Sequence, residues 1–218
     1  MYSSVCSSNI LSIGPTLDPA ILNMKIIALT GFMGCGKSSV GRRLSELLCC
    51  PYMDLDAVIE ERTGRSIPDI FASDGEAAFR QMELETLQNI LEEVGKQIIL
   101  SLGGGTVMTA ECAELVREKT LCIYLRTGVE TLVDRLSSET EGRPLLNPES
   151  HPEADDSNNS QKKSGTDLRT RIESLISGRA STYEATAHIT IDTDGLSVDD
   201  LAHSIQRKTS DYTSSSRS

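Results

Sequence analysis

The segment "MKIIALTGFMGCGKSS", Met24 to Ser39, decides the fold of this 218-residue chain. Its first seven residues form a short apolar run without polar alternation, which is typical of a strand buried on both faces. The following "GFMGCGKS", Gly31 to Ser38, matches G-x-x-x-x-G-K-[ST], the phosphate-binding loop (P-loop) that joins such a strand to a helix. The segment therefore predicts an α/β protein that binds a nucleotide.

Each residue type of the P-loop has a physical purpose. Glycines let backbone N–H groups point inward at phosphate oxygens, and the following helix adds the partial positive charge of its N-terminus. Lys37 is predicted to place its ammonium against the β- and γ-phosphates, and Ser38 to offer its hydroxyl to Mg²⁺. The alternative is a glycine-rich turn without a ligand, and we interpret Cys35 as incidental rather than as a redox switch. The residues predicted to bind ATP here are Gly34, Cys35, Gly36, Lys37, Ser38 and Ser39.

Strand-like and helix-like segments alternate along the rest of the chain. Further strands are predicted at 51–56, 97–105, 121–126 and 188–193, and helices at 38–49, 57–63, 66–94, 110–119, 129–136, 168–177 and 198–208. The long helical segment 66–94 is interrupted near Ser73–Gly75. This alternation favours a doubly wound, five-stranded parallel sheet between two helical layers, an α/β/α arrangement.

Three segments have compositions that do not support a packed core. Residues 1–23 are Ser-rich and contain no Lys or Arg, so we expect a disordered N-terminal extension, with Met24 as an alternative start. Residues 144–166 are rich in Pro, Ser, Asn and acids, and we expect a mobile lid over about 138–166. Residues 209–218 are predicted to be a disordered tail. The remaining residues, 24–208, are predicted to form one domain.

Composition excludes several functional classes. The formal net charge is −11 and no basic block is present, which argues against nucleic acid as a partner. No apolar run approaches the roughly 20 residues of a membrane span. The six cysteines form no C-x-x-C pair and lie scattered in apolar segments, which argues against a zinc site and for reduced thiols. We expect a cytoplasmic monomer.

Two acids follow the second predicted strand in "MDLDAVIEERTGR". In parallel α/β sheets, ligands gather at the carboxyl ends of the strands, which places Asp54, Asp56 and the glycines of "SLGGG" beside the P-loop. Asp54 would then lie near Mg²⁺, and Asp56 would accept a hydrogen bond from an acceptor hydroxyl, orienting it or taking its proton. The alternative is that Asp56 caps the helix that follows.

Three arginines sharpen the prediction: Arg80, Arg143 and Arg179. A planar guanidinium binds a carboxylate with two hydrogen bonds. Together with an acid placed to bind a hydroxyl, these arginines predict that the molecule that accepts the phosphoryl group carries both a carboxylate and hydroxyls. The N-K-x-D motif of GTP-binding switches is absent from the sequence. A small chain with a lid-like loop favours a kinase of a small molecule.

The sequence resembles the shikimate kinase family over residues 24 to about 207. The motifs that carry the resemblance are "GFMGCGKSSVGRRL", "MDLDAVIEERTGRSIPDIFASDGEAAFRQME", "LSLGGGTV", "GRPLL" and "GRASTYEATA", in the family's order and spacing. The resemblance implies a P-loop kinase of the nucleoside-monophosphate-kinase type. It implies transfer of the ATP γ-phosphate to the 3-hydroxyl of shikimate, with Mg²⁺, in the pathway to chorismate and the aromatic amino acids.

The resemblance also implies roles for individual residues. The implied catalytic residues are Lys37, Asp56 and Arg143. Shikimate would be bound by Asp56, Arg80, Gly104 and Arg179, within a loop shaped by Gly103 and Gly105. Arg135 resembles the arginine that stacks on adenine, Arg143 would meet the phosphates with the lid, and Ser38 with Asp54 would hold Mg²⁺. Glu83 would orient Arg80 through an i,i+3 ion pair.

Two departures from the family pattern stand out. An insertion of about ten Ser, Asn and acidic residues follows "RPLL", and a proline common in the family is missing near "DTDGLS". Two other functions stay open from sequence. One is a P-loop kinase for another hydroxy acid such as gluconate, and the other is a nucleotide-binding module without catalytic activity.

Overall fold

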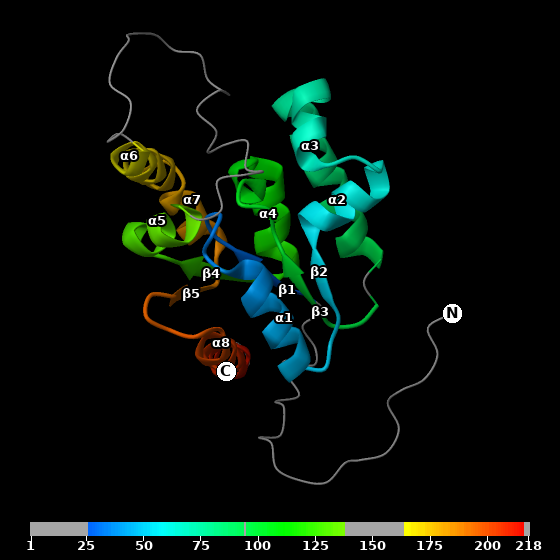
Figure 1. The fold of residues 1–218 in the computed structure, drawn as a ribbon. Helices are drawn as coiled ribbons and strands as arrows, with labels where there is room; N and C mark the ends of the chain where they lie inside the picture. The colour runs from blue at the N-terminus through cyan, green and yellow to red at the C-terminus, as the bar shows by residue number, and fades with distance from the viewer. Residues whose placement is uncertain (1–25, 94, 138–163, 216–218) are drawn as a thin grey trace, which may run out of the picture.

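The computed structural model describes residues 26–93, 95–137 and 164–215 (Figure 1). The predicted N-terminal extension and most of the predicted lid, including Arg143, lie outside these ranges. The strands are β1 (Ile26–Thr30), β2 (Tyr52–Asp54), β3 (Ile98–Ser101), β4 (Leu121–Arg126) and β5 (Ile189–Asp192). The helices are α1 (Lys37–Leu47), α2 (Leu55–Thr63), α3 (Ile67–Glu93), α4 (Ala110–Lys119), α5 (Val129–Ser137), α6 (Ser164–Ser177), α7 (Ala180–Thr186) and α8 (Val198–Ser215), with a 3₁₀ turn, η2, at Thr106–Met108.

The five strands form one parallel sheet in the order β2-β3-β1-β4-β5. The central strand β1 pairs with β3 on one side and β4 on the other, with Ile27 opposite both Ile99 and Leu121. The predicted five-stranded parallel sheet is confirmed. The order reverses beside β1, which is where ligands bind in open α/β sheets.

Both faces of the sheet are buried. Alternate residues of β1 enter different clusters, Ile27 and Leu29 on one face and Ile26 and Ala28 on the other. Helices α1, α5, α6 and α8 cover the first face, and α2, α3, α4 and α7 cover the second. In Figure 1, α2 and α3 lie together at one side of the molecule, and α5 and α6 at the other. The predicted three layers are confirmed.

The second strand is shorter than the sequence predicted. β2 ends at Asp54, and α2 begins directly at Leu55, so the assignment of Asp56 to a strand is wrong. The reason is a cap: the Asp54 carboxylate accepts a hydrogen bond from the Asp56 backbone N–H at 3.2 Å. A side-chain oxygen at this position satisfies a helix N-terminal donor and starts the helix there. The capping role considered for Asp56 therefore belongs to Asp54.

The C-terminal helix is longer than predicted. α8 continues to Ser215, so the prediction of disorder is wrong for residues 209–215. Ser and Thr are common in disordered tails, but Thr209 is buried in the fold and its hydroxyl donates to the Gln206 carbonyl at 2.9 Å. Extending a helix that is already formed costs far less than starting one. The packing of Thr209 is therefore sufficient for α8 to continue beyond residue 208.

The interruption predicted in the long third helix is confirmed at Gly75, where φ is 82° and ψ is 172°. A residue with a Cβ rarely adopts this backbone conformation, so glycine is the residue type suited to the kink. The helical segment after Gly75 carries the side chains that build one wall of the site below. Among the residues that the structure describes, no helix has the length and apolar character needed to cross a membrane.

Candidate active site

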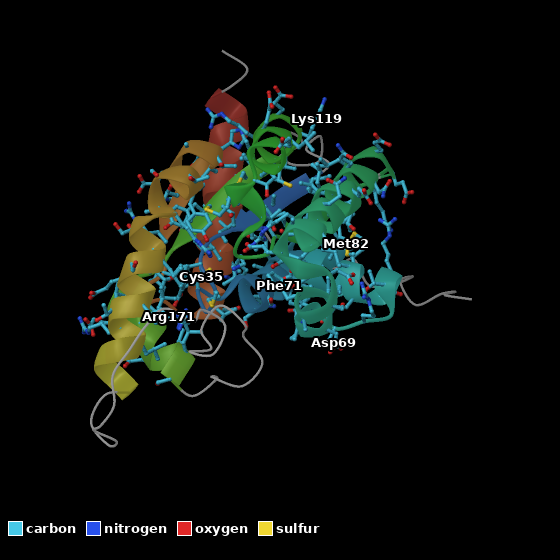
Figure 2. The ribbon with its side chains drawn as sticks, turned by 90° about the horizontal axis from the view of Figure 1, so that it is seen from above. Cys35, Asp69, Phe71, Met82, Lys119 and Arg171 are labelled. Atoms are coloured by element: carbon cyan, nitrogen blue, oxygen red, sulfur yellow. The ribbon has the colours of Figure 1, made fainter. Side chains whose placement is uncertain are left out.

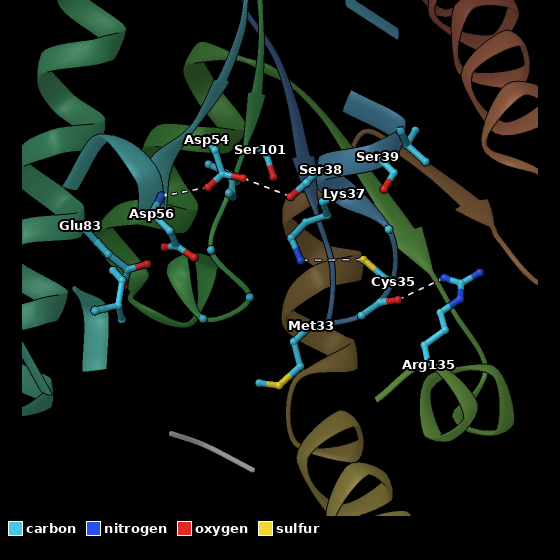
Figure 3. A pocket seen from close by; sticks show the side chains of 18 of the residues that line it. Met33, Cys35, Lys37, Ser38, Ser39, Asp54, Asp56, Glu83, Ser101 and Arg135 are labelled. Atoms are coloured by element: carbon cyan, nitrogen blue, oxygen red, sulfur yellow. Dashed lines mark hydrogen bonds between the residues drawn. The ribbon is translucent and has the colours of Figure 1, made fainter. Parts of the chain in front are cut away.

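A cavity of about 920 Å³ lies at the carboxyl ends of β1, β2 and β3 (Figure 3). The P-loop forms one part of it, and α2, α3 and the glycines after β3 form the other. Thirteen of the predicted site residues line it together. They are Gly34, Cys35, Gly36, Lys37, Ser38, Ser39, Asp54, Asp56, Arg80, Gly103, Gly104, Gly105 and Arg135.

The P-loop is folded tightly around the Lys37 side chain. The ammonium of Lys37 donates to the carbonyls of Gly31 at 2.8 Å and Phe32 at 3.1 Å. Gly31 has a φ of 144°, and a Cβ there would lie 2.7 Å from the Leu125 carbonyl oxygen. No other residue fits this position, so the close approach of the loop to β4 requires glycine.

Cys35 is a packing residue in this loop. Its side chain is 1% exposed and belongs to the cluster between the sheet and α1, and Figure 2 places it in the interior of the molecule. The sulfur lies 3.8 Å from the Lys37 ammonium. A small buried thiol fills space here.

Three groups hold the Asp54 carboxylate. One oxygen accepts hydrogen bonds from the Ser38 hydroxyl at 3.2 Å and the Tyr52 hydroxyl at 2.9 Å, and the other caps α2. The predicted metal ligands Ser38 and Asp54 are thus adjacent (Figure 3). A hydroxyl and a carboxylate are the hard oxygen donors that Mg²⁺ prefers. Among the described residues, no group of three or more His, Cys, Asp or Glu side chains could hold a metal ion.

The Asp56 carboxylate faces a narrow space beside the glycine loop. A Cβ on Gly103 would lie 2.8 Å from an Asp56 oxygen and 2.9 Å from a Glu83 oxygen, so this space excludes any side chain at Gly103. Burial, the Glu83 carboxylate and the Asp54 carboxylate together raise the pKa of Asp56 to about 6, although Lys37 opposes them. Asp56 is therefore a stronger base than an ordinary aspartate.

Arg80 is fixed by two glutamates of its own helix. It pairs with Glu83 at 2.5 Å and with Glu76 at 3.0 Å. Glu83 is 1% exposed and also accepts from the Thr106 hydroxyl at 2.7 Å, so its position is set from two sides. The predicted i,i+3 pair of Arg80 and Glu83 is confirmed. A Cβ on Gly105 would lie 2.6 Å from the guanidinium, so glycine is required for Arg80 to lie there.

Comparison with known proteins assigns the family. A family model described as shikimate kinase matches residues 33–210. The chain belongs to the shikimate kinase family. A curated shikimate kinase of Chlorobium chlorochromatii is 40% identical over 186 residues, which cover 84% of this chain and 91% of the relative. A shikimate kinase of Thermus thermophilus is 39% identical over 183 residues, which cover 84% and 88%.

A solved structure supports the same assignment. The shikimate kinase from Acinetobacter baumannii in complex with shikimate superposes with a TM-score of 0.75 at 32% sequence identity. The match covers 88% of this chain and 96% of the A. baumannii chain. This shikimate kinase family member therefore shares both the sheet and the helical layers of its relatives.

In this shikimate kinase family member, Arg135 lies on α5 across the cavity from Asp56 (Figure 3). Its guanidinium donates to the Gly34 carbonyl at 3.1 Å. Leu196 and Val198, which are 43% and 41% exposed, line the same cavity. A cationic plane and two exposed apolar side chains make a surface suited to a flat aromatic base.

Arg179 is not among the residues that line the cavity as it stands. It is the N-terminal cap residue of α7, and one of its terminal nitrogens, Nη1, is buried without a hydrogen-bond partner among the described residues. A buried donor without an acceptor is costly and suggests that a ligand supplies one.

Sequence reasoning missed three hydroxyl groups that support the site: Tyr52, Thr106 and Tyr183. Tyr52 carried a usable signal, because residues two apart on a strand point to the same face and Asp54 is its neighbour there. Thr106 and Tyr183 carried none. Their partners Glu83 and Gly104 are 23 and 79 positions away in the chain.

Proposed function

We propose that this chain transfers the γ-phosphoryl group of ATP to the 3-hydroxyl of shikimate, giving shikimate 3-phosphate and ADP. This reaction belongs to the pathway to chorismate and the aromatic amino acids. The observation that carries the proposal is one cavity lined by Lys37 of the P-loop, the basic carboxylate Asp56 and the guanidinium Arg80. A phosphate cradle, a base and a carboxylate grip are the three parts that this reaction needs.

On the nucleotide side, the P-loop amides from Gly34 to Ser39 hold the phosphates of ATP. The Lys37 ammonium exchanges its carbonyl contacts for phosphate oxygens and steadies the group in transfer. Arg135 packs on the adenine, with Leu196 and Val198 as apolar neighbours. Arg143, which lies outside the described residues, is proposed to reach the phosphates when ATP is bound.

Ser38 and Asp54 are the residues that would hold Mg²⁺. Their oxygens lie 3.2 Å apart and are the donor types that this ion takes, which supports the assignment. Bound there, Mg²⁺ would neutralise charge on the β- and γ-phosphates. Tyr52 and the α2 backbone keep the Asp54 carboxylate turned toward Ser38.

On the acceptor side, Arg80 and Arg179 are proposed to bind the shikimate carboxylate. Glu83 and Glu76 hold Arg80 in a defined orientation, and the buried Nη1 of Arg179 requires an acceptor that a carboxylate would supply. Gly103, Gly104 and Gly105 let the backbone come close to the ring, since side chains at Gly103 or Gly105 would strike Asp56 or Arg80.

Asp56 is proposed to accept the hydrogen bond of the 3-hydroxyl and to take its proton as the oxygen attacks phosphorus. Its pKa of about 6 keeps it ionised at neutral pH and makes it a better proton acceptor than an aspartate in water.

The direct test is release of ADP from Mg·ATP by the purified chain, with shikimate compared against gluconate and quinate. We expect rapid, saturable ADP release with shikimate and little with the other acids. Lys37→Met is the control for contaminating kinases, because it removes the phosphate ligand and leaves the acceptor side intact. ADP release with gluconate alone would assign the other hydroxy-acid function, and nucleotide binding without turnover on any acid would indicate a silent binding module.

A further inference from the structure

Tyr183 is a buried tyrosine whose hydroxyl reaches the acceptor side of the site from behind. Its side chain is fully buried, and its ring stacks on Tyr124 with centroids 5.1 Å apart. Its hydroxyl donates to the Gly104 carbonyl at 2.5 Å. A tyrosine packed in an apolar cluster needs a partner for its hydroxyl, and here the partner is the glycine loop itself.

Gly104 is the point where the two halves of the site meet. It lines the cavity, and a Cβ there would lie 3.4 Å from the Met33 backbone nitrogen and 3.7 Å from the Gly31 carbonyl of the P-loop. A trans peptide directs its C=O and N–H in opposite directions. Holding the Gly104 carbonyl on Tyr183 therefore fixes the Gly105 N–H on the side away from the tyrosine ring.

Tyr183 is also tied to Arg179. The two residues lie one helical turn apart, and the Tyr183 backbone N–H donates to the Arg179 carbonyl at 3.0 Å. Burial raises the pKa of the Tyr183 hydroxyl, and the positive charge of the neighbouring Arg179 guanidinium opposes that rise. One side chain thus connects the helix that carries Arg179 with the loop that carries Gly104.

We propose that Tyr183 is a positioning residue for the acceptor. Its hydroxyl sets the distance between Arg179 and the Gly104–Gly105 peptide, so that both reach the same acceptor carboxylate and ring. Tyr183 acts through the loop and not on the reacting groups, because its hydroxyl is hydrogen-bonded to the Gly104 carbonyl. This inference rests on the proposed function, which assigns the acceptor to this loop and to Arg179.

The test is Tyr183→Phe, which keeps the ring and its stacking and removes only the hydroxyl. We expect the KM for shikimate to rise about fivefold to tenfold, with the KM for ATP unchanged, because the loss falls on acceptor binding. A purely structural hydroxyl would lower the melting temperature and the active fraction, while leaving both KM values as they were. An unchanged KM for shikimate, or an equal rise in both, would overturn the proposal.

Tyr124→Phe is the matched control, because it removes a hydroxyl from the stacking partner, which donates no hydrogen bond to the loop in the described part of the chain. Its KM values should equal those of the wild type. Rates are taken well below the melting temperature of each variant, so that a less stable Tyr183→Phe protein is still folded when measured.

A double-mutant cycle with Arg179→Lys tests the link between the two residues. If Tyr183 positions Arg179, the double variant should raise the KM for shikimate by less than the product of the single effects. Multiplicative effects would contradict the proposal. Wild-type turnover separates the two hypotheses: no ADP release with shikimate defeats the proposed function, whereas normal wild-type turnover with an unaffected Tyr183→Phe defeats only the positioning role.

Discussion

Asp56 is held ionised in surroundings that disfavour its charge. Burial raises its pKa most, the Glu83 and Asp54 carboxylates raise it further, and the Lys37 ammonium opposes them. The sequence placed two acids at the mouth of the site. In the structure the two acids have different contacts. Asp54 caps α2 and faces Ser38, whereas Asp56 faces Glu83 and the glycine loop.

Replacing Asp56 with Asn should abolish turnover and stabilise the protein. The folded-state pKa of about 6 lies above the ordinary 3.8, so the contribution of Asp56 to stability is present below pH 4 and is lost as the pH rises through 6. At pH 7.5 the variant avoids this loss, and we expect a gain of about 3 kcal/mol in the free energy of unfolding.

Chemical denaturation of both proteins from pH 7.5 down to pH 4.5 checks this prediction. The gain should shrink as the pH falls, because protonation relieves the wild-type protein of the same unfavourable charge. A variant that is less stable than the wild type at pH 7.5 would contradict the argument.

The raised pKa also predicts the pH dependence of the reaction. Asp56 must be ionised to accept the hydroxyl proton, so kcat/KM for shikimate should fall below an apparent pKa of about 6. Glu83→Gln removes one of the charges that raise the pKa of Asp56. The acidic limb of the pH profile of this variant should move to lower pH, although the variant also loses the ion pair that orients Arg80. A limb near pH 4 in the wild type would contradict the prediction, because it is the value of an aspartate whose pKa is not raised.

At the scale of elements, the position of α1 over the sheet depends on one glycine. Gly41 faces the Tyr52 ring, and a Cβ there would lie 2.6 Å from a ring carbon and 3.2 Å from Leu29. The helix therefore lies close to β2, and this closeness brings Ser38 at its start within hydrogen-bonding distance of Asp54. The Tyr52 ring also supports Arg42, whose guanidinium lies 4.9 Å from the ring centroid.

Gly41→Ala should destabilise the protein by about 1–3 kcal/mol, although alanine is the better helix former by about 1 kcal/mol. Overpacking against Tyr52 outweighs helix propensity because both the ring and β2 are fixed. Thermal unfolding measures the effect. Gly178→Ala is the matched control, since its Cβ would meet only backbone oxygens at 3.8 and 3.9 Å, and it should leave stability nearly unchanged.

At the scale of the whole molecule, the parallel sheet assembles the site. The carboxyl end of β1 leads into the P-loop, that of β2 into Asp54, and that of β3 into Gly103. Because β3 lies between β1 and β2 in the sheet, the acceptor glycines lie between the nucleotide cradle and the two acids. Figure 3 shows Asp56 and Glu83 on one side of the cavity and Lys37 and Arg135 on the other.

Separate nucleotide and acceptor sites in one domain predict independent effects on stability. Mg·ADP at about 100 times its Kd should stabilise the protein by about 2.7 kcal/mol, which raises Tm by about 5–10 °C. Lys37→Met should lose most of this shift and keep the shift caused by shikimate, because Arg80 and Arg179 lie on other elements. Loss of both shifts in Lys37→Met would show that the two sites do not bind independently.

The sequence by itself determined the features that are encoded locally. The P-loop needs only a strand, a glycine turn and a helix start within 16 residues, and the buried strands show their burial in their own composition. The five parallel strands, the kink at Gly75 and the pair of Arg80 with Glu83 were predictable for the same reason. Local boundaries were less certain, as the end of β2 and the length of α8 show.

Only the tertiary structure decided how strongly Asp56 holds its proton and what supports the acceptor loop. The pKa of Asp56 depends on Glu83, and the Gly104 carbonyl depends on Tyr183, which lies 79 positions away. Neither the pKa of Asp56 nor the partner of the Gly104 carbonyl can be predicted from the local sequence, because burial and long-range hydrogen bonds arise only when distant segments pack together. Periodicity and motifs report the chemistry of neighbouring residues, whereas the electrostatics of a site belongs to the packed molecule.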